Sequence, residues 1–293
     1  MIFGFIIPAL VEELSLLEGC INNLHTICDS IPDIQPVFAV ILQGRLDTAP
    51  EWLLGDPSVD LQILPNRGVS NARNQGLMRL ENTTDFLMFV DVSVRPGSDF
   101  IRGALQALRT ELVVSAPVSF DDHISTSPSV RNVTVRQISA VRVVFRAFIW
   151  STAFRTTAIT GLRFDPSIGP GTSSPHQSGE DGRFLYLVKM RHHLKNVSWL
   201  NNISVVRPSR PDLQNKITRY AHGQGVLLGQ QLRAPGWSIL DRLYLLMRVF
   251  LFIANSFKFF LKGPSSRKVS LVRLNALLIG LGVRPADGGP QLM

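Results

Sequence analysis

The chain has 293 residues, of which 45% are hydrophobic, so it is long enough for one large domain with a buried core, or for one domain plus an appendage. Its two cysteines, Cys20 and Cys28, lie in a helical pattern without a partner cluster. This excludes a disulfide framework or a zinc cluster and favours a reduced cytosolic compartment. The apolar N-terminus lacks a basic segment and soon reaches Glu12 and Glu13, which predicts a buried strand and not a signal peptide.

The net charge of +8 is divided unevenly along the chain. Residues 1–181 contain 13 basic and 19 acidic residues, a balance of −6, whereas residues 182–293 contain 17 and 3, a balance of +14. A basic block predicts an anionic partner, either lipid headgroups or nucleic acid, although a basic face without a partner is the plainer alternative. Nucleic acid is not expected, because the aromatic residues of this half lie in apolar helical patterns without a base-stacking motif.

The first part of the chain alternates strand and helix patterns. Short apolar runs predict buried strands at Ile2–Ile7, Val37–Leu42, Leu61–Leu64, Phe86–Val90 and Leu112–Val118. Helical patterns are found at Val11–Ser30, Ser70–Leu80 and Ser98–Arg109, the last with Ser98 or Asp99 as its N-cap. Repeated strand–helix–strand units predict an α/β fold with a mostly parallel sheet flanked by helices on both faces.

Two long polar segments interrupt this alternation. Ser119–Arg136 is rich in Ser, Asp and Thr, and Asp165–Asp181 is rich in Gly, Pro and Ser. Neither segment has the periodicity of a helix or a strand, so both are predicted to be loops or insertions. Loops of this length in a compact domain are more often functional than not.

The segment Ile239–Leu261 is strongly apolar, but its longest uncharged stretch, Val249–Phe257, is about half of the ~20 residues that a membrane-spanning helix needs. Polar residues recur every seven positions as a narrow stripe of Asp241, Arg248, Asn255 and Lys262. With its basic neighbours, this amphipathic pattern predicts a helix lying in a membrane interface. The alternative is a helix whose broad apolar face packs on the rest of the chain or on a second subunit. A second apolar segment, Val269–Val283, has a similar in-plane character.

Polar residues at the ends of the predicted strands are the candidates for a ligand site, because ligands of parallel sheets bind beyond the carboxyl ends of the strands. The first four strands lead to Pro8, Gln43, Asn66 and Asp91. After the third strand, Gly68 permits a sharp turn, and Arg73 lies near the start of the next helix. A helix N-terminus with an arginine predicts a phosphate site.

These residues follow the order of a known pattern. The strand ending in Pro8 precedes Asn-x-Gly-x-x-x-Ala-Arg-Asn, matched by Asn66, Gly68, Ala72, Arg73 and Asn74. Then come Asp91-Val92-Ser93, Gly161-Leu162-Arg163-Phe164-Asp165 and Gly179-Glu180-Asp181. In these motifs and their spacing, residues 2–186 resemble the family 2 glycosyltransferases with the GT-A fold. The segment Arg219–Leu232 is similar to a segment of bacterial members that build surface polysaccharides.

The resemblance implies a GT-A-like nucleotide-sugar-binding catalytic domain over residues 1–235. The charge and apolar pattern of residues 236–293 predict a basic, membrane-associated helical extension. The resemblance also implies an inverting transfer of a sugar from a nucleotide-sugar donor to a hydroxyl of a glycan or lipid-linked acceptor, in cell-surface polysaccharide synthesis. The residues that it implies for the donor are Pro8, Gln43, Asn66, Gly68, Arg73, Asp91 and Ser93.

Two acids are implied as catalytic residues. Asp181 is expected to take the acceptor proton, with Glu180 supporting donor or acceptor hydroxyls. The residues alone also favour this, because a carboxylate at the start of an apolar helix and after a flexible loop is placed for partial desolvation, which raises its basicity. The plainer alternative is a pair of acids that stabilise the helix dipole.

The fourth strand ends in an incomplete metal motif. The family carries Asp-x-Asp there, which holds a divalent metal against the diphosphate, whereas this chain has Asp91 and Ser93. Mg²⁺ or Mn²⁺ often uses only one or two carboxylates plus substrate phosphates, so a weak metal site at Asp91 is the favoured expectation. The alternative is that arginine neutralises the diphosphate. Arg207 and Arg210 lie near the place of a His that the family commonly carries, and Arg45 and Arg67 are further candidates.

The prediction for the whole chain is therefore a cytoplasmic glycosyltransferase attached peripherally to the inner face of the cell membrane, with an anionic membrane surface as a partner. The alternative is a non-catalytic, glycosyltransferase-like protein that binds nucleotide or glycan within a polysaccharide-assembly complex. Ser93 in place of the second acid of the Asp-x-Asp motif favours this alternative, and so does the lack of the family's usual acid after the second strand, whereas the retained Gly179-Glu180-Asp181 opposes it.

Overall fold

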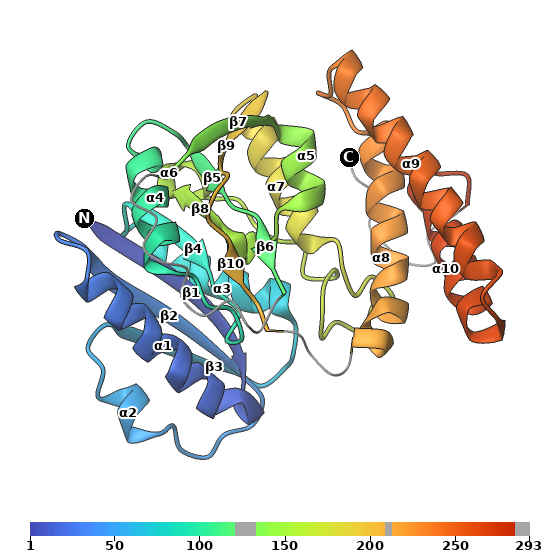
Figure 1. Ribbon diagram of the computed structural model, residues 1–293. Helices are drawn as coiled ribbons and strands as arrows, with labels where there is room; N and C mark the ends of the chain where they lie inside the picture. The colour runs from blue at the N-terminus through green and yellow to red at the C-terminus, as the bar shows by residue number, and fades with distance from the viewer. Residues whose placement is uncertain (121–132, 209–212, 285–293) are drawn as a thin grey trace.

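In the computed structural model, which describes residues 1–120, 133–208 and 213–284, an eight-stranded sheet is flanked by helices, with a group of C-terminal helices beside it (Figure 1). The strand order is β3-β2-β1-β4-β8-β5-β9-β7, and β6 and β10 form a separate pair. The strands are β1 Ile2–Leu10, β2 Gln35–Gln43, β3 Val59–Leu64, β4 Phe86–Phe89, β5 Val113–Ser115, β6 Val118–Ser119, β7 Val135–Ser139, β8 Thr152–Arg155, β9 Asn196–Leu200 and β10 Val205–Val206.

Helices connect the strands. They are α1 Leu14–Asp29, α2 Glu51–Leu54, α3 Val69–Leu80, α4 Ser98–Leu108, α5 Ala140–Arg146, α6 Thr156–Ile159 and α7 Glu180–Arg191, with short 3-10 helices η1 Val11–Glu13 and η2 Ile149–Ser151. The loops before α3 and α7 border the candidate site.

The first half of the sheet has the parallel α/β arrangement that the sequence predicts. β1 pairs in parallel with β2 and β4, and β2 pairs in parallel with β3. Side chains alternate along β1: Ile6 packs closely on Gly76 of α3, whereas Phe5 stacks on Phe38, which contacts His25 of α1. Helices α1 and α3 therefore cover opposite faces, and the carboxyl ends of β1, β2 and β4 meet at one edge of the sheet.

The second half of the sheet departs from the parallel order. β8 lies antiparallel between β4 and β5, and β7 lies antiparallel beside β9. The single strand predicted at Leu112–Val118 is two strands, β5 and β6. The physical reason is Pro117, which lies between them and has no N–H for a sheet ladder. After Pro117 the chain leaves the main sheet, and β6 pairs with β10.

Two predictions for loops and caps have mixed outcomes. Helix α4 begins at Ser98 with Gly97 as its N-cap, so the predicted N-cap at Ser98 or Asp99 is wrong, because both residues already lie in the first turn. The loop predicted at Asp165–Asp181 ends at Gly179, and α7 begins at Glu180, so Glu180 and Asp181 belong to the helix. Of the loop predicted at Ser119–Arg136, residues 121–132 lie outside the described residues.

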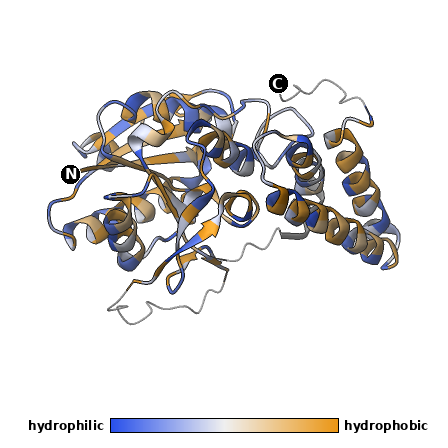
Figure 2. Cartoon of the chain, turned by 90° about the horizontal axis from the view of Figure 1, so that it is seen from above, coloured by the Kyte–Doolittle hydropathy of each residue, from blue (hydrophilic) through white to orange (hydrophobic). Residues whose placement is uncertain are grey.

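Three C-terminal helices, α8 Leu213–Arg233, α9 Ile239–Phe260 and α10 Pro264–Gly280, pack on one another beside α7 (Figure 1). Gly225 and Gly229 of α8 let the backbone of α10 approach closely, because a Cβ at either position would collide with it. Hydrophobic residues, orange in Figure 2, continue from the sheet into these helices. Among the described residues, α9 has the length and the mean hydropathy, 1.5, of a helix that crosses a membrane.

Candidate functional site

A cavity of about 750 Å³ lies where the ends of β1, β2 and β4 meet the start of α7 and the C-terminal helices. Of the residues predicted for the site, it is lined by Pro8, Gln43, Gly68, Arg73, Asp91, Glu180 and Asp181. Gln43 is buried, and its side-chain oxygen accepts a hydrogen bond from the backbone N–H of Gly68 at 2.7 Å. This bond joins the end of β2 to the loop before α3. Asn66 is exposed, and neither it nor the half-buried Ser93 is part of this lining.

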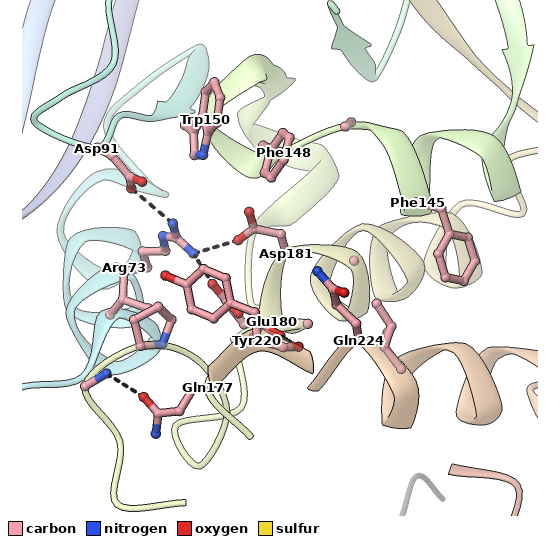
Figure 3. Close-up of a pocket in the computed structure, with 18 of the residues that line it drawn as sticks. Arg73, Asp91, Phe145, Phe148, Trp150, Gln177, Glu180, Asp181, Tyr220 and Gln224 are labelled. Atoms are coloured by element: carbon pink, nitrogen blue, oxygen red, sulfur yellow. Dashed lines mark hydrogen bonds and ion pairs between the residues drawn. The ribbon is translucent and has the colours of Figure 1, made fainter. Parts of the chain in front are cut away.

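Arg73 is the centre of the charge network in the cavity (Figure 3). Its Nη1 donates to Asp181 Oδ1 at 2.8 Å and lies 3.6 Å from Glu180 Oε1, and its Nη2 donates to Asp91 Oδ1 at 3.2 Å. Burial alone would lower the pKa of Arg73, but Asp181, Asp91 and Glu180 raise it above its ordinary value. Carboxylates from the end of β4 and the start of α7 thus share one buried guanidinium.

The Ala-Arg-Asn motif explains how Arg73 is placed. The Arg73 guanidinium lies 5.4 Å from the ring centre of Phe164. Asn74 donates to the carbonyl of Phe164 at 2.9 Å and accepts from its N–H at 2.8 Å. The motif therefore ties α3 to the Gly161–Asp165 segment, which precedes the loop to α7. Phosphate binding by Arg73 remains a prediction, since its guanidinium is engaged by three carboxyl groups.

Helix α7 presents two acids in its first turn. The preceding Gly179 has a φ of 102°, a left-handed conformation that glycine adopts without strain. Asp181 Oδ2 accepts from the backbone N–H of Ile149 at 3.2 Å, while Oδ1 accepts from Arg73, so the carboxylate orientation is fixed. Burial, together with the Asp181 charge, raises the pKa of Glu180 to about 8 against the opposing effect of Arg73. This raised pKa favours the protonated form of Glu180, which can donate a hydrogen bond.

Asp91 also faces a second guanidinium. Val206 of β10 forms a bridge with Arg95, which places Arg207 beside the end of β4. Arg207 Nη2 lies 3.3 Å from Asp91 Oδ2, and its guanidinium lies 5.2 Å from the ring centre of Trp150. Each carboxylate oxygen of Asp91 therefore contacts an arginine. Of the other arginines considered from the sequence, Arg67 pairs with Glu12, Arg45 is exposed, and Arg210 lies outside the described residues.

The residues around Asp91 do not fit a divalent cation in this arrangement. Both carboxylate oxygens face guanidinium groups, whose positive charge would repel a metal ion at the same oxygens. Within the described parts of the chain, no group of three or more His, Cys, Asp or Glu residues is placed to hold a metal. Mg²⁺ or Mn²⁺ at Asp91 therefore remains a prediction from the sequence, and these contacts favour arginine.

The C-terminal helices complete the cavity, which the sequence did not indicate. The lining includes Tyr220 and Gln224 of α8, Arg248 and Asn255 of α9, and Arg273 of α10. Arg248 and Asn255 belong to the stripe with seven-residue spacing, so the spacing correctly gave them a common face. Nothing in the sequence indicated that this face turns toward the carboxylates.

A cavity at the carboxyl ends of a mostly parallel sheet is compatible with the predicted GT-A-like fold, and comparison with solved structures confirms that prediction. S. aureus TarS 1–349 superposes with a TM-score of 0.66 at 14% identity, covering 96% of this chain and 81% of that chain. Its complex with UDP-GlcNAc gives 0.66 at 15% identity, over 97% and 82% of the two chains. Its complex with UDP gives 0.55 at 12% identity, over 98% and 95%. No protein-family model matches the sequence, and no curated protein does.

Proposed function

We propose that this chain is a glycosyltransferase that uses a nucleotide-sugar donor. The observation that carries the proposal is the shared guanidinium of Arg73, which brings Asp91 and Asp181 into one cavity at the strand ends. Ligands of such sheets bind beyond these ends, so the Asp91 side suits the donor diphosphate and the Asp181 side suits the acceptor. The neighbouring structures with UDP and UDP-GlcNAc support a uridine diphosphate sugar as the first donor to test.

In the proposed reaction, Asp181 takes the proton of the acceptor hydroxyl as the hydroxyl oxygen bonds to the anomeric carbon of the sugar. The bond from that carbon to the diphosphate oxygen breaks, its electron pair leaves with the nucleoside diphosphate, and the configuration inverts. Protonated Glu180 donates a hydrogen bond to a sugar hydroxyl. Arg207, held by Asp91 and Trp150 at the cavity, supplies positive charge to the leaving diphosphate.

We further propose that the reaction belongs to cell-surface polysaccharide synthesis at the cytoplasmic face of the membrane, and that the chain is a family 2 enzyme. The support is the motif order from Pro8 to Asp181 and the basic helices that close the cavity.

The test is to incubate the purified chain with a panel of nucleotide sugars and hydroxyl acceptors, with Mn²⁺ or EDTA, and to measure nucleoside diphosphate release. Asp181→Asn should keep nucleotide affinity while turnover falls by roughly 10²-fold or more. Asp47→Asn, at an exposed position, is the matched control. Comparable turnover in Asp181→Asn and the parent would refute the assignment of the base.

A second candidate function is a nucleotide- or glycan-binding partner without turnover. Two observations favour this binding function. Arg73 is engaged by three carboxyl groups, and Ser93 stands where the strand motif has its second acid. Nucleotide binding without product from any donor of the panel would select this candidate.

A further inference from the structure

Where the C-terminal helices line the cavity, two arginines lie against aromatic rings. The guanidinium of Arg248 lies 5.4 Å from the ring centre of Phe145, and that of Arg273 lies 4.3 Å from the ring centre of Phe252. All four residues line the cavity. Arg273 Nε is buried without a hydrogen-bond partner among the described residues. Two arginines held against aromatic rings thus line one space.

The Arg248–Arg273 end of the cavity fits an anionic group joined to an apolar one. Guanidinium groups bind phosphate oxygens in a bidentate manner, and a phosphate would offset the positive charge that Arg248 and Arg273 bring together. Leu227, Leu228 and Leu251 line the same cavity and suit a hydrocarbon chain. A neutral sugar has no charge that would use these arginines. The chemistry therefore points to a phosphate ester of a lipid.

Helix α9 also carries an exposed apolar stripe. Its members recur at steps of three and four residues and are between 37% and 79% exposed: Ile239, Leu243, Leu246, Phe250, Ile253, Phe257 and Phe260. Such spacing places them on one face. A continuous apolar surface of this kind marks an interaction site.

The positive charge of the segment around the stripe favours an anionic bilayer as the partner of the stripe. Residues 236–284 contain eight Lys or Arg residues and one acid, Asp241, which accepts a hydrogen bond from Ser238 at the start of α9. A second copy of the chain would bring the same positive charge against the stripe, whereas anionic headgroups would bring the opposite charge. Because α9 packs on α8 and α10, it suits a position in the plane of the bilayer.

Leu251, which follows Phe250 of the stripe in sequence, lines the cavity and is 46% exposed, so the cavity and the stripe adjoin on α9. We propose that α9 lies in the plane of an anionic bilayer, and that the Arg248–Arg273 end of the cavity binds the phosphate of a lipid-linked acceptor from that bilayer. The role as an acceptor rests on the proposed transferase function, but both binding surfaces are testable without turnover.

The bilayer contact is tested by co-sedimentation of the full chain with vesicles of phosphatidylcholine, with or without about 30% phosphatidylglycerol. Phe250→Glu and Leu243→Glu should each lower partitioning to anionic vesicles by about tenfold or more, because each replaces an inserted apolar side chain by a charge. Leu54→Glu, at a position 61% exposed on α2, is the matched control and should bind like the parent. High salt should weaken binding by the parent.

Two results would overturn the bilayer contact. One is equal vesicle binding by the stripe variants and the parent. The other is a parent dimer in sedimentation equilibrium that Phe250→Glu dissociates, with no vesicle binding, since the stripe would then be a subunit interface.

The phosphate end is tested by calorimetry with decyl phosphate, and with decanol as its uncharged counterpart. Arg273→Gln should weaken decyl phosphate binding by roughly tenfold or more, since hydrogen bonds to charged groups are among the strong ones. Lys258→Gln, exposed on α9 outside the cavity lining, is the control. UDP affinity should be unchanged in Arg273→Gln. Equal binding of decyl phosphate by Arg273→Gln and the parent, or of decanol and decyl phosphate by the parent, would overturn the phosphate site. Lack of turnover with intact decyl phosphate binding would count against the proposed function alone.

Discussion

The buried position of Glu180 makes the stability of the chain depend on pH. Burial and the Asp181 charge raise its pKa from 4.5 to about 8, so the folded chain keeps a proton that the unfolded chain releases between these values. Because the folded state binds more protons than the unfolded state in this window, stability falls as the pH rises from 4.5 to about 8. Below the window both states are protonated and Glu180 has no effect. Above it the full destabilisation is present.

Glu180→Gln removes this titration and keeps the shape of the protonated acid. One pKa unit corresponds to about 1.4 kcal/mol. With the two pKa values of 4.5 and about 8, ionisable Glu180 costs about 1 kcal/mol at pH 5 and about 3 kcal/mol at pH 7. The unfolding free energy of the variant minus that of the parent should therefore be about 2 kcal/mol larger at pH 7 than at pH 5.

Urea titrations of both proteins between pH 5 and pH 8, followed by tryptophan fluorescence, measure this gain. Glu18→Gln, at an exposed position of α1, is the control and should follow the parent. A difference between Glu180→Gln and the parent that stays constant across the series would refute the raised pKa. A difference that shrinks as the pH rises would show that Arg73 holds Glu180 in its ionised form.

Three further predictions concern the diphosphate side and the loop before α7. Arg207→Gln should weaken nucleoside diphosphate binding by roughly tenfold or more; calorimetry measures it, and an unchanged affinity would contradict the role of Arg207. EDTA should leave the affinity of the parent for nucleoside diphosphate unaltered, and Ser93→Asp should weaken this binding in the absence of metal. Loss of binding by the parent in EDTA would instead show that a metal ion binds at Asp91. Gly223→Ala should lower the urea midpoint, because a Cβ there would collide with the backbone oxygen of Ser178; an unaltered midpoint would show that α8 can shift.

The first half of the fold could be predicted from the sequence because its signals are local. The apolar run of β1 is buried on both faces, and apolar spacing alone defines α1. Gly68 and the Ala-Arg-Asn motif follow β3 at short range, so they could be assigned to the carboxyl edge of a parallel sheet. For the same reason most of the predicted site residues line one cavity.

What could not be predicted depends on contacts between distant segments. Arg207 reaches Asp91 because β10 bonds to the segment after β4, and no local pattern encodes that pairing. Glu180 and Asp181 are adjacent in sequence, yet only the folded chain shows that Glu180 is the more buried of the two, with side chains 10% and 18% exposed. The seven-residue spacing places Arg248 on the polar face of α9, but the packing of α8 and α10 decides which part of the chain this face meets.

The charges of the whole cavity connect the two proposals. Among the described residues, its lining contains six arginines and four acids: Arg67, Arg73, Arg146, Arg207, Arg248 and Arg273, with Glu13, Asp91, Glu180 and Asp181. With Glu180 protonated and Arg67 paired with Glu12, this leaves an excess of two positive charges. The diphosphate of a nucleotide sugar carries about two negative charges, and an acceptor phosphate carries about one to two more. The positive excess therefore offsets much of the charge of a donor diphosphate and an acceptor phosphate bound together. A neutral acceptor would leave the Arg248–Arg273 end without a counter-charge.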